Sequence, residues 1–232
     1  GWTRVTEGTA VGTFYGYETN GIMQQDEDPS QVPYFQGFTP EPGLRKYVDQ
    51  NDDGILDEDD RVKLGNAAPD FSFGWRNNFT YRNWSLNVYL QGVYGNEIVN
   101  FNRFGLESFD GRRNNSTKAL NRWQPDDPSN KYPKADATPV SKVLSDHQVE
   151  DGSFVRVKDI TLAWQIPNAL LERVNLNSAS VYVSAQNVFT LTNYTGYDPE
   201  VSRFANDPLS RGADYGSYPH ARQLMVGIRT NF

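Results

Sequence analysis

The last residues of the chain alternate between apolar and polar side chains, and this period of two is the feature that most narrows the possible fold. The apolar parity contains Leu224, Val226, Ile228 and Phe232, and the other contains Gln223, Met225, Gly227, Arg229 and Asn231. Such alternation predicts a strand with one apolar and one largely polar face. In water, a terminal edge strand of this kind would expose an apolar stripe and unpaired amides. In an outer-membrane barrel, the stripe faces lipid and the strand edge is closed by a neighbour.

The same period recurs upstream. It predicts six strands in all, at 11–19, 71–82, 84–96, 154–166, 180–192 and 224–232. In the fourth strand the apolar parity changes, because Val155 and Val157 are out of phase with Ile160 and Leu162. A β-bulge near Lys158 and Asp159 would bring both halves onto one face.

The connections between these strands alternate in length. Long, polar, proline-dotted segments occupy 20–68, 97–150 and 193–221, whereas the other connections are short. Outer-membrane barrels sort their connections in this way, with short periplasmic turns and long outside loops. We therefore predict an all-β fold, a segment of a transmembrane antiparallel β-barrel, with extracellular long loops and a periplasmic C-terminus. About six strands cannot close a barrel of at least about eight, so we expect the chain 1–232 to complete a barrel begun elsewhere. A soluble β-sandwich with long loops is the alternative.

Composition excludes several classes of protein. No run of apolar residues is long enough for a transmembrane helix or a secretory signal. The net charge of -7 argues against nucleic-acid binding. There is no cysteine, and His147 and His220 are the only two histidines, far apart in the sequence. Thiolate metal sites are therefore excluded, and a histidine-based catalytic centre is not expected.

An acidic stretch at 49–60 has the spacing of a calcium-binding loop. Oxygen ligands occur at its positions 1, 3, 5, 7 and 12, which are Asp49, Asn51, Asp53, the Ile55 carbonyl and Asp60. Gly54 occupies position 6, where the chain must turn sharply. We expect Ca²⁺ here, or less favourably Mg²⁺, in a structural role. The alternative is a solvated acidic turn without an ion.

Catalysis is not expected. Asp198 and Glu200 could be imagined as a glycosidase pair, but two carboxylates two residues apart beside Pro199 have no fixed separation. Loop aromatic and arginine side chains are instead the candidates for substrate contact. They are Tyr34, Phe104, Arg112, Trp123, Tyr197 and Arg203.

Several motifs resemble the C-terminal barrel region of the SusC/RagA-type TonB-dependent outer-membrane transporters. In the order of that family, they are 12–22 (GTFYGYETNGI), the acidic loop ending at Asp60-Arg61, 64–66 (LGN), 69–71 (PDF), 90–96 (LQGVYGN), 151–162 (DGSFVRVKDITL), 183–189 (VSAQNVF), 194–200 (YTGYDPE) and 214–219 (DYGSYP). They span nearly the whole chain.

The resemblance implies a barrel of about 22 strands, plugged by an N-terminal domain and energised by TonB. It also implies a SusD-like surface lipoprotein as partner and import of oligosaccharides or peptides across the outer membrane of a Gram-negative bacterium. The plug and the TonB-contacting segment are absent from this chain. The competing hypothesis is a secreted, calcium-stabilised β-sandwich that binds carbohydrate.

Overall fold

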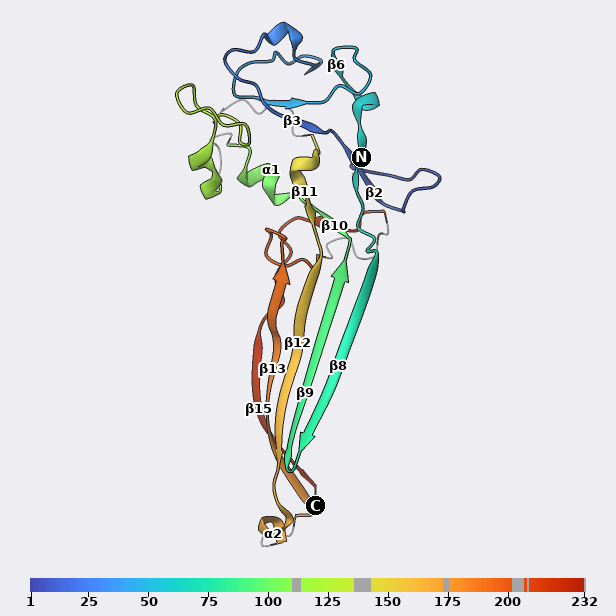
Figure 1. Cartoon of the computed structure of the whole chain (residues 1–232), viewed down its shortest axis with the longest axis vertical. Helices are drawn as coiled ribbons and strands as arrows, with labels where there is room; N and C mark the ends of the chain where they lie inside the picture. Colours follow the sequence, from blue (N-terminus) through green and yellow to red (C-terminus); the bar gives the residue numbers. More distant parts are fainter. Residues whose placement is uncertain (110–113, 136–142, 173–175, 202–206, 208, 232) are drawn as a thin grey trace. The chain divides into compact units, whose positions relative to one another are not determined.

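The computed structural model describes residues 1–109, 114–135, 143–172, 176–201, 207 and 209–231 (Figure 1). The chain divides into two compact units. Unit 1 comprises Gly1–Ala68, Glu97–Asp151 and Glu200–Ser217, and unit 2 comprises Pro69–Asn96, Gly152–Pro199 and Tyr218–Phe232. In the described residues, no helix has the length and apolar character needed to cross a membrane.

Unit 2 is built on one antiparallel sheet of five strands in the order β15-β13-β12-β9-β8 (Figure 1). The strands are β8 (Phe71–Tyr81), β9 (Trp84–Tyr94), β12 (Phe154–Gln165), β13 (Ser178–Thr192) and β15 (Gln223–Asn231). Five of the six predicted strands are thus confirmed. A tight turn joins β8 to β9, and Arg82 adopts a φ of 54° there. A short helix, α2 (Asn168–Leu171), lies between β12 and β13.

The register of the strand pairs places the alternating apolar residues of all five strands on one face of the sheet. Phe79 pairs with Leu86, Leu86 with Leu162, Leu162 with Val183, and Val183 with Val226. This face is open in unit 2: Trp75, Val183 and Ile228 are 45%, 43% and 70% exposed. No second sheet buries these side chains among the described residues of unit 2, unlike the interior of a sandwich.

The predicted bulge is confirmed. The pairing of β12 with both neighbours shifts between Val157 and Asp159. Lys158 is the extra residue relative to β9, whereas β13 spans the same step with one residue more than β12. As a result, Val157 and Ile160 lie on the same apolar face although they are three residues apart.

The opposite face of the sheet is polar and internally bonded. Asn87 donates to Asn78 (2.6 Å), and the Thr161 hydroxyl donates to Asp159 (3.1 Å), beside the bulge. Gly227 lies beneath the ring of Tyr182, where a Cβ would stand 2.5 Å from ring atoms. The absent side chain of Gly227 is what lets that ring lie flat across β15.

Unit 1 is formed from the long connections and has only short elements. Its strands are β1 (Thr3–Arg4), β2 (Thr13–Gly16), β3 (Thr19–Ile22), β4 (Tyr34–Phe35), β5 (Arg45–Tyr47), β6 (Ile55–Leu56), β7 (Val62–Gly65), β10 (Glu97–Asn100), β11 (Val149–Asp151) and β14 (Ala213–Asp214). Its helices are α1 (Asn102–Leu106) and the 3₁₀ turns η1 (Pro29–Gln31), η2 (Glu58–Asp60), η3 (Thr117–Asn121) and η4 (Asp146–Gln148). The pairings are β1-β2-β7, β11-β10-β14, β3-β5 and β4-β6.

Two small hydrophobic clusters hold unit 1 together. Phe14, Val99 and Leu144 form the first, and Tyr17, Tyr47 and Leu56 form the second. Residues from distant parts of the sequence meet in each cluster. The short strands of this unit are therefore fixed by packing rather than by their own length.

The prediction that residues 11–19 form the first strand of the barrel sheet is wrong. Thr13–Gly16 forms β2 there, and β3 begins at Thr19. β2 pairs with β1 and β7, and β3 pairs with β5, so both lie in unit 1, outside the five-stranded sheet. Consecutive residues Thr13 and Phe14 are both fully buried. A strand buried on both faces cannot present one face to lipid and the other to water, so the apparent alternation at 11–19 was misleading. Phe232, predicted to end the last strand, lies outside the described residues.

Candidate binding pocket and metal-binding loop

The acidic loop 49–60 folds as a series of side-chain-capped turns. Three side chains accept hydrogen bonds from backbone amides further along the loop. The Asp49 carboxylate accepts one from Gly54 (2.7 Å), the Asn51 side-chain oxygen accepts one from Asp53 (3.2 Å), and the Asp53 carboxylate accepts one from Ile55 (2.8 Å). Gly54 has a φ of +83°, in the left-handed region that position 6 requires. Desolvation raises the pKa of the Asp49 carboxyl, but backbone N–H donors led by Gly54 outweigh it, so the pKa lies below its usual value. The loop thus holds an ionised carboxylate at its first position.

Asp60 closes this loop from its far end. Its side chain is fully buried, and its two oxygens accept from the amides of Gln50 (2.8 Å) and Asp57 (2.7 Å). Leu56, also buried, anchors the middle of the loop in the second hydrophobic cluster. In the described residues, no three carboxylates of this loop lie within 4.8 Å of one another, so binding an ion would require the side chains to turn from the loop amides toward a common centre.

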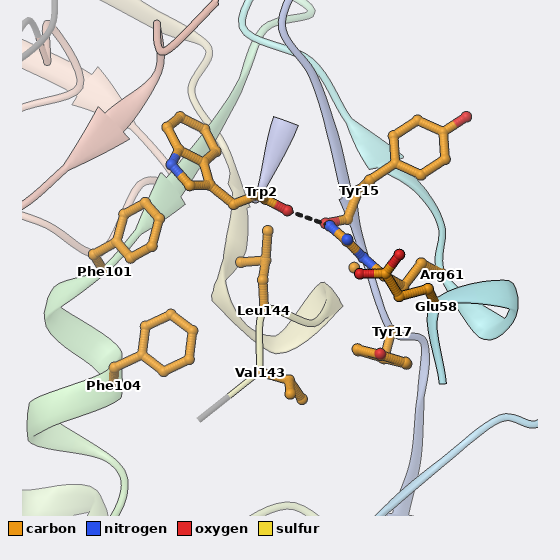
Figure 2. Close-up of a pocket in the computed structure, with 11 residues that line it drawn as sticks. Trp2, Tyr15, Tyr17, Glu58, Arg61, Phe101, Phe104, Val143 and Leu144 are labelled. Atoms are coloured by element: carbon orange, nitrogen blue, oxygen red, sulfur yellow. Dashed lines mark hydrogen bonds between the residues drawn. The ribbon is translucent and has the colours of Figure 1, made fainter. Parts of the chain in front are cut away.

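A cavity of about 410 Å³ lies beside η2, the turn that ends the acidic loop (Figure 2). Segments from five places in unit 1 contribute its walls. The lining residues are Gly1, Trp2, Tyr15, Gly16, Tyr17, Glu58, Arg61, Phe101, Phe104, Val143 and Leu144. Figure 2 shows Phe101 and Phe104 on the α1 side and Arg61 with Glu58 across the cavity.

Aromatic rings on the α1 side of the cavity pack against one another. The ring of Phe101 stacks on that of Tyr215, with 4.2 Å between the ring centroids and an interplanar angle of 7°. It also stacks on the ring of Phe104, with 5.7 Å between the centroids and an angle of 26°. Trp2 meets Phe101 edge-on at 5.4 Å. The Phe101 ring is thus stacked against two other rings on this wall.

The other side of the cavity is charged. The Arg61 Nη2 donates to the carbonyl of Tyr15 (3.0 Å) and to that of Gly1. Among the described residues, neither the rest of the Arg61 guanidinium nor the Glu58 carboxylate has a hydrogen-bond partner, and no ion pair joins them. Burial, opposed by Arg61, raises the pKa of the Tyr17 hydroxyl, which therefore stays protonated at neutral pH.

A buried ionic cluster lies elsewhere in unit 1. Glu107 accepts from Arg103 (3.0 Å), Lys118 (2.5 Å) and His147 (2.8 Å), and its side chain is only 4% exposed. Burial raises the pKa of Glu107, but the hydrogen bonds from His147, Arg103 and Lys118 more than offset that and hold it well below its usual range. Burial lowers the pKa of His147 despite its bond to Glu107. This cluster ties α1, η3 and η4 together.

Asp198 is a structural residue in unit 2. Its buried carboxylate accepts from the Arg156 guanidinium (2.6 Å) and from the amide and ring of His220 (3.0 and 2.9 Å). A carboxylate engaged in this way fixes the connection after β13 to strand β12. Both of its oxygens are therefore engaged by hydrogen bonds within unit 2.

The predicted substrate contacts do not gather in one place. Phe104 lines the cavity, whereas Trp123 is buried and donates its indole N–H to Gln24 (3.1 Å). Tyr34 and Tyr197 are exposed at 43% and 79%, in unit 1 and unit 2 respectively. Arg112 and Arg203 lie outside the described residues.

Sequence reasoning missed the other members of the cavity wall, above all Trp2, Glu58 and Arg61. The Asp60-Arg61 pair at the end of the acidic loop was visible, but nothing in its spacing indicated that Arg61 would face an aromatic pocket.

Comparison with known proteins gives consistent matches. No family model matches the sequence. The chain is 33% identical over 231 residues to TonB-dependent receptor P3 of Formosa agariphila, covering 97% of this chain and 22% of that protein. It is 26% identical over 223 residues to TonB-dependent receptor SusC of Bacteroides thetaiotaomicron, covering 94% of this chain and 20% of SusC.

A solved structure of the RagAB peptide transporter superposes with a TM-score of 0.74 at 22% identity, covering all of this chain and 24% of that one. At this identity the likeness shows the fold alone, which is the antiparallel barrel sheet and its long loops. The chain spans about a fifth to a quarter of the length of the curated relatives it matches.

Proposed function

Because this chain is homologous over nearly its whole length to TonB-dependent receptors of the SusC/RagA kind, we propose that it is part of an outer-membrane nutrient importer. Unit 2 would supply five strands of the barrel wall, and the remaining strands, the plug and the TonB-contacting segment would come from the rest of the longer protein. The protein would not be an enzyme: its work is to bind a nutrient and let it pass.

The observation that carries this proposal is the one-sided apolar sheet. Its apolar face runs unbroken across five strands and is open in unit 2, whereas its other face is polar. Lipid against one face and water or protein against the other would satisfy both. Within the described residues, the outer edges of β8 and β15 carry no further strand, so each could pair with another strand of a closed barrel.

The long connections in unit 1 would lie on the extracellular side, with the hairpin turns and the C-terminus in the periplasm. A SusD-like lipoprotein would cover these loops, and TonB would act through the portion of the protein beyond this chain. The cargo would be an oligosaccharide or a peptide. The name of the RagAB peptide transporter supports a peptide, whereas the match to SusC supports the family without specifying the cargo.

We also propose that the loop 49–60 binds Ca²⁺, or less tightly Mg²⁺, through Asp49, Asn51, Asp53, the Ile55 carbonyl and Asp60. Its support is the donor spacing, the left-handed Gly54 and the burial of Asp60. The ion would stiffen a segment that has little apolar surface of its own.

The test of import uses the complete protein in its own host. A strain lacking it, complemented by the wild-type gene or by one without the TonB-contacting segment, is grown on oligosaccharides or on peptides as the sole nutrient. Growth on one of these should require the intact gene, and the protein should need detergent for extraction. Unimpaired growth of the deletion strain on both nutrients, or a detergent-free soluble protein, would instead favour a secreted carbohydrate-binding module.

A further inference from the structure

Two opposite charges line the pocket of unit 1 without pairing with each other. Arg61 commits only its Nη2 to backbone carbonyls, and Glu58 is exposed at the pocket wall with a free carboxylate among the described residues. A half-buried guanidinium with unused N–H groups is suited to a carboxylate, which it can bind through two parallel hydrogen bonds. Glu58 beside it is suited to an ammonium group.

Apart from Gly1 and the two tyrosines, Tyr15 and Tyr17, the other lining residues are apolar or glycine. Phe104, Leu144 and Val143 also line the cavity, and Figure 2 shows Phe104 on the side away from Arg61 and Glu58. A volume of about 410 Å³ is in the range of small-molecule sites, and such sites combine apolar walls with a few placed polar groups.

We infer that this pocket binds the zwitterionic head of an α-amino acid with an apolar side chain. The carboxylate would lie on Arg61, the ammonium group on Glu58, and the side chain against Phe104, Leu144 and Val143. A ligand with only one charge leaves the other protein charge unpaired.

A sugar ring fits this pocket less well. Sugars bind aromatic side chains through open ring faces, whereas the faces of Phe101 are covered by Tyr215 and Phe104. The hydroxyls of a neutral sugar also do not neutralise Arg61 or Glu58. The pocket therefore favours an amino-acid ligand over a carbohydrate, independently of what the rest of the protein transports.

This inference goes beyond the proposed import function, and it can be wrong even if the import function is right. It concerns the equilibrium binding of a ligand to one pocket. The experiment titrates the complete protein in detergent by calorimetry with four probes. They are phenylalanine with both charges, phenylalaninamide without the carboxylate, N-acetylphenylalanine without the ammonium group, and glucose.

Phenylalanine should bind at least about tenfold more tightly than either single-charge probe, and glucose should not bind. Glu58→Gln should weaken the binding of phenylalanine and of phenylalaninamide by about tenfold, and it should leave the binding of N-acetylphenylalanine unchanged. Phe104→Leu should weaken all three aromatic probes, and Glu7→Gln, at an exposed position of unit 1 outside the pocket, should alter none.

Equal binding of the four probes, no binding of phenylalanine, or a Glu58→Gln protein with wild-type affinities would overturn the inference. Binding of glucose alone would assign the pocket to carbohydrate instead. In each case, growth of the complemented strain on its nutrient still reports separately on import.

Discussion

At the scale of single residues, Glu107 is a buried carboxylate of unit 1 that is held by three basic partners. It is buried and accepts from Arg103, Lys118 and His147, so its charge is balanced only while all of these partners are in place. Removing one partner of a buried charge cluster leaves the others uncompensated, which is far more costly than losing an exposed ion pair.

Glu107→Gln should therefore destabilise α1 and its neighbours by about 3 kcal/mol at neutral pH. Hydrogen exchange of residues 102–107 in the complete protein measures this local opening. The matched control is Glu27→Gln, which breaks the more exposed pair with Lys46 and should cost less than about 1 kcal/mol.

The pH dependence follows from the lowered pKa of Glu107. A carboxyl whose pKa is lower in the folded state contributes stability above its unfolded pKa, and loses it as pH falls through the folded value. Protection of residues 102–107 in the wild type should thus decline below about pH 4.5. The difference from Glu107→Gln should shrink over the same range; a gap that stays constant would contradict this account.

At the scale of elements, strand β15 offers a direct test of the two faces of the sheet. Val226 lies on the apolar face at 72% exposure, and the adjacent Met225 lies on the polar face at 40%. If the apolar face meets lipid, Val226→Lys should destabilise the barrel by up to about 2–4 kcal/mol, whereas Met225→Lys should have little effect.

The measurement is the heat-induced shift of the complete protein from its folded to its unfolded position in gel electrophoresis. A lower transition temperature for Val226→Lys alone is expected. Equal sensitivity of both positions would mean that the two faces of the sheet are in similar surroundings.

The acidic loop gives a second prediction at this scale. Removal of Ca²⁺ by a chelator should accelerate hydrogen exchange of residues 49–60 in the complete protein, because the ion would replace missing apolar contacts. Asp49→Ala should make the loop insensitive to the chelator, and Asp26→Ala, outside the loop, should behave as the wild type. Identical exchange with and without Ca²⁺ in the wild type would reduce the loop to a solvated turn.

At the scale of the whole molecule, sequence predictability follows the periodicity of the chain. The five long strands could be predicted because alternation sustained over nine or more residues matches the two faces of a strand and does not match the period of a helix. The phase change between Val157 and Ile160 even located the bulge. Strand β2 could not be predicted correctly, because its four residues, three buried and one half-buried, show no alternation between a buried and an exposed face.

The pocket was beyond sequence reasoning for a different reason. Trp2, Arg61, Phe104 and Leu144 come from segments up to about 140 residues apart. Only the hydrophobic packing of unit 1 brings them together. By contrast, the proposed metal ligands lie within twelve consecutive positions, so their spacing can be read directly from the sequence.

The register of the sheet determines where the long connections of the chain begin and end. The last residues of β9 and of β13 both pair with the first residues of β12. The connections that follow β9 and β13 therefore begin and end at the same end of the strands. Lengthening a connection costs only slowly growing entropy, and neither connection touches the pairing at the hairpin end. The long connections of unit 1 can therefore differ in length or sequence without altering the strand pairing of unit 2.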